Sequence, residues 1–143
     1  MSSVFVDTDV VLDLYIRREP HHDVALKLFS HLKKTNTRCF TSAVVIANTY
    51  YILAKTESAR YAIDKIRKLR KFISVAPLRE ATIDFALAVP HKDFEDSIQL
   101  HCAMQNGINT LITRNTKDYP KEQRIKITDP LQFLSAATFL EQR

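Results

Sequence analysis

The sequence predicts an α/β protein: a three-layer α/β/α sandwich around a central, mainly parallel sheet. Two observations lead to this prediction. Short apolar runs typical of buried strands alternate with longer segments whose apolar residues recur at helical spacing, and such alternation implies parallel pairing through right-handed crossovers. The chain also has one glycine and five prolines in 143 residues, which leaves little room for the tight turns of all-β folds.

Five apolar runs have the length and composition of strands. They comprise residues 4–6, 38–41, 72–76, 110–113 and 125–128. The third of them stops at Pro77, because proline cannot donate a hydrogen bond to a strand ladder.

Helical spacing fills the gaps between the first three runs. Residues 22–33 carry apolar side chains three and four positions apart and predict the first helix. Residues 42–54 are apolar nearly all round, so we expect a buried helix there. Ser58 is placed to cap a third helix. The apolar face of this helix consists of Ala59, Ala62, Ile63, Ile66 and Leu69.

Three more helices are predicted in the second half of the chain. Residues 81–88 form a short one, and residues 94–105 form another that ends at Gly107. The last helix opens at Pro130, since proline is favoured at a first helical position.

The composition is that of an ordinary globular protein, with 45% hydrophobic and 26% charged residues, and we expect one domain, residues 1–143. The N-terminus lacks the pattern of a signal peptide, and the longest uncharged stretch, residues 39–54, is too short and polar to span a membrane. Two cysteines are too few for a disulfide framework. We therefore expect a cytoplasmic protein with no membrane contact.

The net charge is +5, and its distribution is uneven. Six basic residues crowd residues 60–71, where Asp64 alone opposes them. This pattern is compatible with a polyanionic partner, although such segments are more often solvated helix faces.

Acidic and amide side chains stand where apolar runs give way to a turn or a helix start. They are Asp7 after the first run, Asp93 and Asp96 at a helix start, and Asn115 and Asp118 after the fourth run. Open α/β sheets bind ligands beyond the carboxyl ends of their strands. Carboxylates gathered there repel one another, and a hard divalent cation with oxygen ligands is the usual remedy. The sequence therefore predicts a Mg²⁺ or Mn²⁺ site.

Three segments together resemble the PIN-domain family. Residues 4–12, VFVDTDVVL, resemble its opening strand and the Asp-Thr-Asn-Val that follows. Residues 92–97, KDFEDS, resemble its central acidic segment, and residues 110–119, TLITRNTKDY, resemble its late strand and the turn after it. The segments occur in the family's order and at its usual spacing. PIN domains are mostly metal-dependent ribonucleases and include the VapC-type toxins of prokaryotes.

The resemblance implies that Asp7, Asp96 and Asp118 are the catalytic carboxylates, gathered around one or two Mg²⁺ or Mn²⁺ ions. Asp7 is then the first ligand, Asp96 the central one, and Asp118 or Asn115 the last. Asp93 is expected to orient water on the metal from a neighbouring position.

Three further residues, Arg114, Asn48 and Asp9, are assigned to the substrate side of this site. Asn48 departs from the family pattern, because residues 42–51, SAVVIANTYY, place it where the family usually has a glutamate. An amide oxygen still binds a cation or its water but adds no negative charge, so cation affinity and water activation should fall. Asp9 stands where the family often has asparagine and returns part of that charge.

These residues also have purely structural interpretations. Asp7 can cap a helix that begins near residue 10, and Asp93 and Asp96 are placed as a capping pair. Asp118 fits an ordinary turn, and Asn48 fits a hydrogen-bonded core amide.

Two other functions compete with a nuclease. The Asp7 and Asp9 spacing matches the Asp-x-Asp motif of haloacid-dehalogenase-type phosphatases, in which Asp7 is the nucleophile and Asp9 the general acid and base. The other rival, prompted by Asn48, is a PIN fold that binds RNA or a protein without cutting.

The resemblance implies single-stranded RNA as the substrate, with Arg114 as the basic residue best placed to contact a phosphate. It also makes the chain a candidate toxin of a toxin–antitoxin pair. RNA, an antitoxin protein and a second copy of the chain are therefore the candidate partners.

Overall fold

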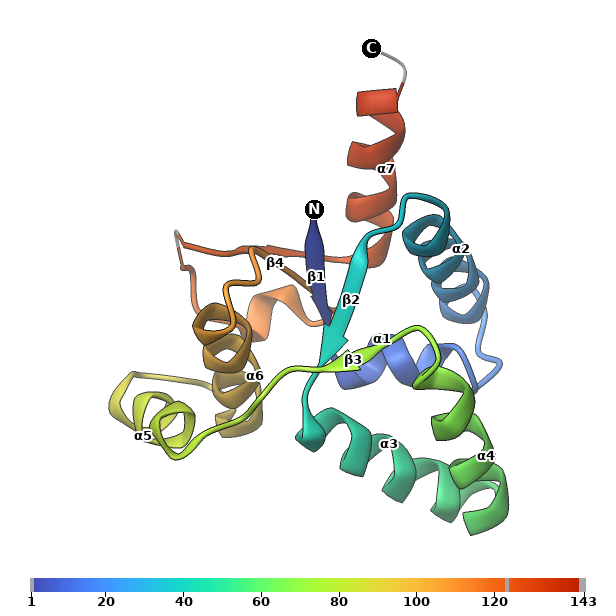
Figure 1. The fold of residues 1–143 in the computed structure, drawn as a ribbon, viewed down its shortest axis with the longest axis horizontal. Helices are drawn as coiled ribbons and strands as arrows, with labels where there is room; N and C mark the ends of the chain where they lie inside the picture. Colours follow the sequence, from blue (N-terminus) through green and yellow to red (C-terminus); the bar gives the residue numbers. More distant parts are fainter. Residues whose placement is uncertain (1, 123, 142–143) are drawn as a thin grey trace.

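Five parallel strands form one sheet in a computed structural model that describes residues 2–122 and 124–141 (Figure 1). The strands are β1 (Ser3–Val6), β2 (Arg38–Thr41), β3 (Ser74–Val75), β4 (Thr110–Ile112) and β5 (Lys126–Thr128). Their order across the sheet is β3-β2-β1-β4-β5, and every neighbouring pair is parallel. The predicted α/β sandwich with a parallel sheet is confirmed; the predicted single domain also includes residues 1, 123, 142 and 143, which lie outside the described residues.

Seven α-helices and one 3₁₀ helix, η1 (Thr116–Asp118), connect the strands in the described residues. The α-helices are α1 (Thr8–Asp13), α2 (His21–Lys34), α3 (Ala43–Thr56), α4 (Ala59–Leu69), α5 (Glu80–Ala88), α6 (Phe94–Gln105) and α7 (Pro130–Glu141). Figure 1 shows α5 and α6 on one side of the strands and α2 and α4 on the other, with β1 and β2 running toward α1 and α3. Right-handed crossovers produce this division, because the chain moves from β1 to β3 in one direction and then returns to β4.

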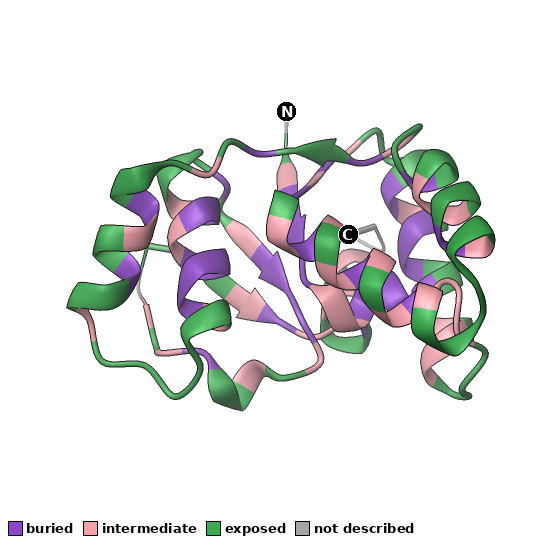
Figure 2. Ribbon diagram, turned by 90° about the horizontal axis from the view of Figure 1, so that it is seen from below, coloured by how far each residue is buried: buried purple, intermediate pink, exposed green. Residues whose placement is uncertain are grey.

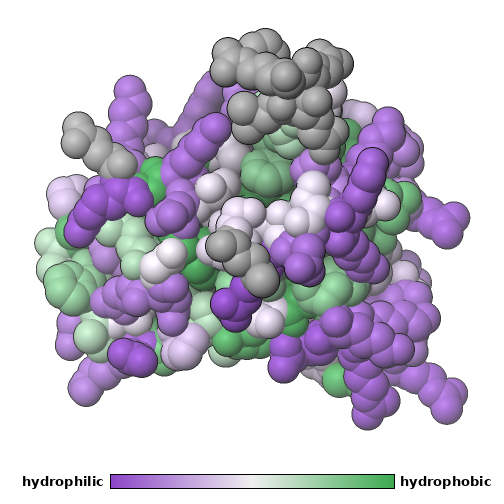
Figure 3. All heavy atoms as spheres, turned by 45° about the horizontal axis from the view of Figure 1, so that its top comes forward, coloured by the Kyte–Doolittle hydropathy of each residue, from purple (hydrophilic) through white to green (hydrophobic). Residues whose placement is uncertain are grey.

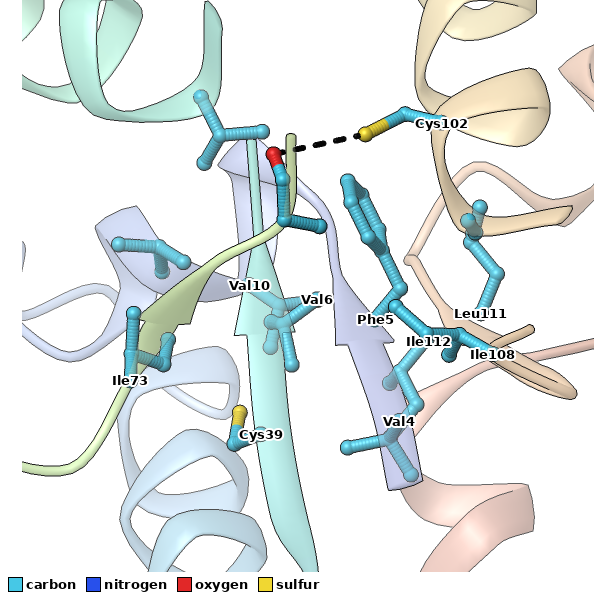
Figure 4. Packing of buried hydrophobic residues seen from close by; sticks show 14 of the residues in the cluster. Val4, Phe5, Val6, Val10, Cys39, Ile73, Cys102, Ile108, Leu111 and Ile112 are labelled. Carbon is cyan, nitrogen blue, oxygen red and sulfur yellow. Dashed lines mark hydrogen bonds between the residues drawn. The ribbon is translucent and has the colours of Figure 1, made fainter. Parts of the chain in front are cut away.

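The central strand β1 is buried on both faces. Val4, Phe5 and Val6 are at most 2% exposed, which is the continuous apolar pattern of a strand covered by helices on both sides. Figure 4 shows Phe5 packed with Leu111 from β4, and Figure 2 shows burial concentrated on the strands and the inward faces of the helices. This core fixes the strand ends from which the site is built.

The predicted helix boundaries agree with the structure at several caps. Ser42 Oγ accepts from Val45 N at 3.2 Å, and Ser58 Oγ accepts from Tyr61 N at 3.0 Å. Gly107 has a φ of 69°, the left-handed conformation expected of a glycine after a helix. The first short helix starts at Thr8, slightly earlier than expected.

Two expectations about local structure are wrong. The third strand contains Ser74–Val75 alone, because the backbone N–H groups of Phe72 and Ile73 still donate to Leu69 O at the end of α4. Helix α3 is not buried all round: Tyr51 is 72% exposed. That helix packs against α1 and α4, which cover only part of its surface.

Hydrophobic side chains also reach the surface elsewhere, as the mixed face in Figure 3 illustrates. The most exposed large ones besides Tyr51 are Leu26, Ile63, Phe85, Leu87 and Leu131. Among the described residues, no helix has both the length and the apolar character needed to cross a membrane.

Candidate active site

The neighbouring strands β1 and β4 end at the same level of the sheet, which brings Asp7 beside Thr113. Val6 pairs with Ile112, and Asp7 N donates to Ile112 O at 3.0 Å. The side chains that follow the two strands therefore meet at the carboxyl edge of the sheet, the expected location of a ligand site.

Asp7 is buried, at 5% exposure, and both its carboxylate oxygens accept hydrogen bonds. Oδ1 accepts from Thr8 N at 2.7 Å, while Oδ2 accepts from Thr113 Oγ1 at 3.0 Å and from Tyr119 OH at 2.9 Å. Burial raises the pKa of Asp7, and these hydrogen bonds work against that increase. The predicted capping role is confirmed, and the contacts from distant segments give the carboxylate a fixed orientation.

Asp93 and Asp96 come from the start of α6. Asp93 Oδ1 accepts from Asp96 N at 3.1 Å, so the predicted cap is confirmed for Asp93. The pKa of Asp96 is raised to about 7. Partial burial is the largest cause, and the negative charges of Asp7 and Asp93 are the next largest. Asp118 in η1 contributes to this rise as well. Asp7 and Asp118 thus both act electrostatically on Asp96, although the three residues lie far apart in sequence.

The turn after β4 contributes one exposed carboxylate and one buried hydroxyl. Asp118 and Asn115 are both exposed, and Asn115 meets the site through its backbone N–H, which donates to Thr113 Oγ1 at 3.1 Å. Burial and the charge of Asp7 raise the pKa of Tyr119, so its hydroxyl stays protonated and donates to Asp7. Whether Asn115 and Asp118 bind a cation stays a prediction.

Asp9 lies next to this group at the start of α1. Its Oδ2 accepts from Arg114 N at 3.0 Å, whereas its buried Oδ1 has no hydrogen-bond partner. Burial and then the charge of Asp7 raise the pKa of Asp9 to about 7. A buried carboxylate oxygen without a donor is costly, so this atom favours a proton or a cation nearby.

The guanidinium of Arg114 forms an ion pair that the sequence does not reveal. Nε lies 2.7 Å from Asp13 Oδ2, and Nη2 lies 3.3 Å from Asp13 Oδ1. The Asp13 side chain is 2% exposed and that of Arg114 is 27% exposed. Arg114 therefore has a structural partner, and its predicted phosphate contact stays a prediction.

Asn48 and Glu95 form a second contact that the sequence does not reveal. Asn48 Nδ2 donates to Glu95 Oε1 across the space between α3 and α6. The pKa of Glu95 is raised, mainly by its partial burial and to a smaller extent by the negative charges of Asp7 and Asp93. Asn48 is half-buried and bonded to an acid, so it is not the core amide considered above. Glu95 was visible in the motif KDFEDS but carried no signal that distinguished it from a solvated helix residue.

The carboxylates of Asp7, Asp9, Glu95 and Asp96 have the chemistry that binds a hard divalent cation, although the structure does not show a complete set of metal ligands. Among residues 2–122 and 124–141, no three acidic, histidine or cysteine side chains are arranged closely enough to hold a metal directly. The carboxylates nevertheless raise one another's pKa, and Asp9 Oδ1 lacks a donor. Oxygen-only donors with excess negative charge are what Mg²⁺ and Mn²⁺ select.

An open cleft of about 310 Å³ lies beside η1 and has Asp118 in its lining. It is lined by Pro90, His91, Lys92, Asp118, Tyr119 and Pro120. Lys92 Nζ donates to Lys117 O at 3.4 Å, so the lining contains one lysine, Lys92, and one acid, Asp118.

The raised pKa of Asp96 predicts how the stability of the metal-free protein changes with pH. Between the ordinary value of 3.8 and about 7, the folded protein holds a proton that the unfolded chain releases. Stability should therefore fall as pH rises through this interval. We expect this in melting curves of the wild type and of Asp96→Asn, recorded in chelator at the two ends of the interval. As pH rises, the melting temperature of the wild type should fall by on the order of 5 °C more than that of the variant. Parallel curves for the two proteins would contradict the shift.

Comparison with known proteins identifies the family. A sequence model described as PIN domain matches residues 3–117. Ribonuclease VapC1 of Aquifex aeolicus (strain VF5) is 23% identical over 131 residues, which cover 88% of this chain and 90% of that protein.

Solved structures of toxin–antitoxin proteins share the fold. VapBC2 from Rickettsia felis, bound to a DNA fragment from its promoter, has a TM-score of 0.68 and 14% identity, covering 89% of this chain and 98% of that chain. A toxin–antitoxin complex from Klebsiella pneumoniae has a TM-score of 0.67 and 20% identity, with coverage of 90% and 98%. VapC20 of Mycobacterium tuberculosis, a toxin that cleaves the sarcin–ricin loop, has a TM-score of 0.60 and 20% identity, with coverage of 76% and 86%.

The family match begins at β1 and reaches into η1, so it includes the strand ends and the helix start that position the acids. The resemblance read from the three sequence segments is confirmed, and the chain belongs to the PIN-domain family.

Proposed function

We propose that this protein is a divalent-metal-dependent ribonuclease that cleaves single-stranded RNA and serves as the toxin of a toxin–antitoxin pair. The observation that carries the proposal is Asp7, a buried carboxylate at the carboxyl edge of the sheet, whose charge, like that of Asp118, raises the pKa of Asp96 at the start of α6. The similarity to Ribonuclease VapC1 and to VapC toxin structures supports it.

In this proposal Asp7 and Asp96 hold the principal Mg²⁺ or Mn²⁺ ion, and Asp118 holds it through water or helps to bind a second one. A bound cation would activate water and offset negative charge on the phosphate. Asp93 caps α6 and thereby positions Asp96. Thr113 and Tyr119 orient the Asp7 carboxylate.

RNA is the substrate class that the charge distribution favours. Helix α4 carries most of the basic segment and packs against α3, which contributes Asn48 to the site. Lys92 adds positive charge at the open cleft, and its ammonium group contacts the backbone of Lys117. Contacts between these basic groups and the phosphates would position an RNA strand without recognising its base sequence.

An antitoxin protein is the proposed partner, since several structural neighbours are complexes of a toxin with its antitoxin. A second copy of this chain is also expected as a partner, as the sequence predicted. The proposal places the protein in the cytoplasm, together with its RNA substrate.

The comparisons do not favour the two rival functions. The chain belongs to the PIN family rather than to the haloacid-dehalogenase type. The non-catalytic role rested on Asn48, whose missing charge is offset by the neighbouring Glu95.

Metal removal tests the proposal directly. Cleavage of a fluorescent single-stranded RNA should require Mn²⁺ or Mg²⁺ and stop in chelator, because the acids alone cannot activate water. Adding excess Mn²⁺ back should restore it. Cleavage that persists after exhaustive chelation would exclude the proposed chemistry, and a covalent aspartyl-phosphate on Asp7 would favour the phosphatase.

A further inference from the structure

Asn48 on α3 and Glu95 on α6 form a contact between two helices that come from distant parts of the chain. They are 47 positions apart, and Asn48 Nδ2 donates to Glu95 Oε1. Figure 1 shows α3 below the ends of the strands and α6 beside them, so the contact spans the carboxyl edge of the sheet. It brings the carboxylate of Glu95 to the side of the site where Asn48 itself provides no charge.

The position of Glu95 within α6 separates it from Asp96. Adjacent residues on a helix point about 100° apart, so the two side chains leave α6 in different directions. Asp96 is influenced by the charge of Asp118, whereas Glu95 reaches Asn48 on α3. The charge of Asp7 influences both. The carboxylate of Glu95 therefore contacts α3, while the charge of Asp7 acts on it as well.

We infer that Glu95 is a further ligand of the divalent cation and that Asn48 is the residue that positions it. The inference rests on the proposed nuclease function. Glu95 supplies a carboxylate at the side of the site where α3 carries a neutral amide.

An asparagine suits this positioning role for a chemical reason. Its amide donates a hydrogen bond to a carboxylate without cancelling the negative charge, as a lysine or arginine would. The bond also limits the rotation of a long side chain that is otherwise exposed, and so lowers the entropy lost when Glu95 binds a cation. The second oxygen of the carboxylate remains available.

The variant Glu95→Gln tests the negative charge of Glu95 separately from its hydrogen bond with Asn48. Glutamine keeps an oxygen that accepts from Asn48 Nδ2 but removes the negative charge. By calorimetry, the Kd for Mn²⁺ should weaken on the order of 10- to 100-fold. The metal-free melting temperature should not fall, because removing one of several like charges relieves repulsion. If Glu95 only tied the helices together, Mn²⁺ affinity would stay at the wild-type value.

A variant that exchanges the two groups provides the rescue. In the double variant Asn48→Glu with Glu95→Gln, the carboxylate moves to α3 and the amide to α6, so total charge and the hydrogen-bonded pair are kept. We expect Mn²⁺ affinity to return to within a few-fold of the wild type. Glu57→Gln, at the far end of α3, is the matched control and should leave the Kd unchanged.

The results distinguish this inference from the proposed function. Wild-type affinity in Glu95→Gln, together with weakened Mn²⁺ binding in Asp96→Asn, would overturn the role of Glu95 and leave the nuclease proposal intact. A wild-type protein that binds no Mn²⁺ would overturn both. Weakened binding in Glu95→Gln that the exchange variant restores supports both.

Discussion

Asp7→Asn should reduce RNA cleavage on the order of 10³-fold, the effect of losing one preorganised charged group in an active centre. Asp7 influences every other acid whose pKa is clearly raised at the site: its negative charge contributes to the raised pKa of Asp9, Glu95 and Asp96. Without it, the proposed cation loses its most rigidly held ligand.

The substitution should leave the fold in place, so loss of activity can be assigned to the site. Asparagine has nearly the shape of aspartate, and Thr113 and Tyr119 each carry a hydroxyl that can either donate to it or accept from it. Removing a buried carboxylate also removes a desolvation cost. The metal-free melting temperature should therefore stay near that of the wild type.

Initial rates on a fluorescent RNA in saturating Mn²⁺ measure the effect. Asp96→Asn should show a loss of the same order, while Asp84→Asn, exposed on α5, should keep full activity. Cleavage within tenfold of the wild type in Asp7→Asn would mean that the carboxyl edge of this sheet is not the active site.

The location of these acids followed from the sequence because topology determines it. Asp7 comes directly after a buried strand, and Asp96 is at a helix start that a parallel fold must bring to the same edge. The alternation of strands and helices was enough to predict this arrangement. No knowledge of individual side-chain contacts was needed.

The partners of these acids did not follow from the sequence, because they depend on packing between distant segments. Arg114 meets Asp13 across 101 positions, and Asn48 meets Glu95 across 47. Nothing in the local pattern of either pair indicates the other member. For Tyr51 the composition of α3 was misleading: an apolar helix is buried only where neighbouring elements cover it, and α3 extends beyond the strands (Figure 1).

Arg114→Met should destabilise the protein by about 3–5 kcal/mol, because it leaves a buried carboxylate without its partner. The Asp13 side chain is 2% exposed, and both its oxygens are bound by the guanidinium of Arg114. A melting temperature lower by on the order of 15 °C would correspond to this loss in a chain of this length.

Replacing both partners tests whether the loss comes from the unpaired charge. The double variant Asp13→Leu with Arg114→Met puts apolar groups of similar volume in the same place, and such replacements of a buried ion pair are often neutral. Most of the lost stability should return. A double variant as unstable as Arg114→Met would show that the arginine stabilises the fold through contacts other than Asp13.

The same pair of variants separates the structural role of Arg114 from the predicted phosphate contact. The backbone N–H of residue 114 still donates to Asp9 in both variants, so this part of the site is preserved. If the guanidinium, whose side chain is 27% exposed, also contacts RNA, the double variant should keep its restored stability but show a raised KM that depends less on salt than the KM of the wild type. A wild-type KM at restored stability would assign Arg114 to the fold alone, and Lys92 at the cleft would then be the basic residue expected to contact phosphate.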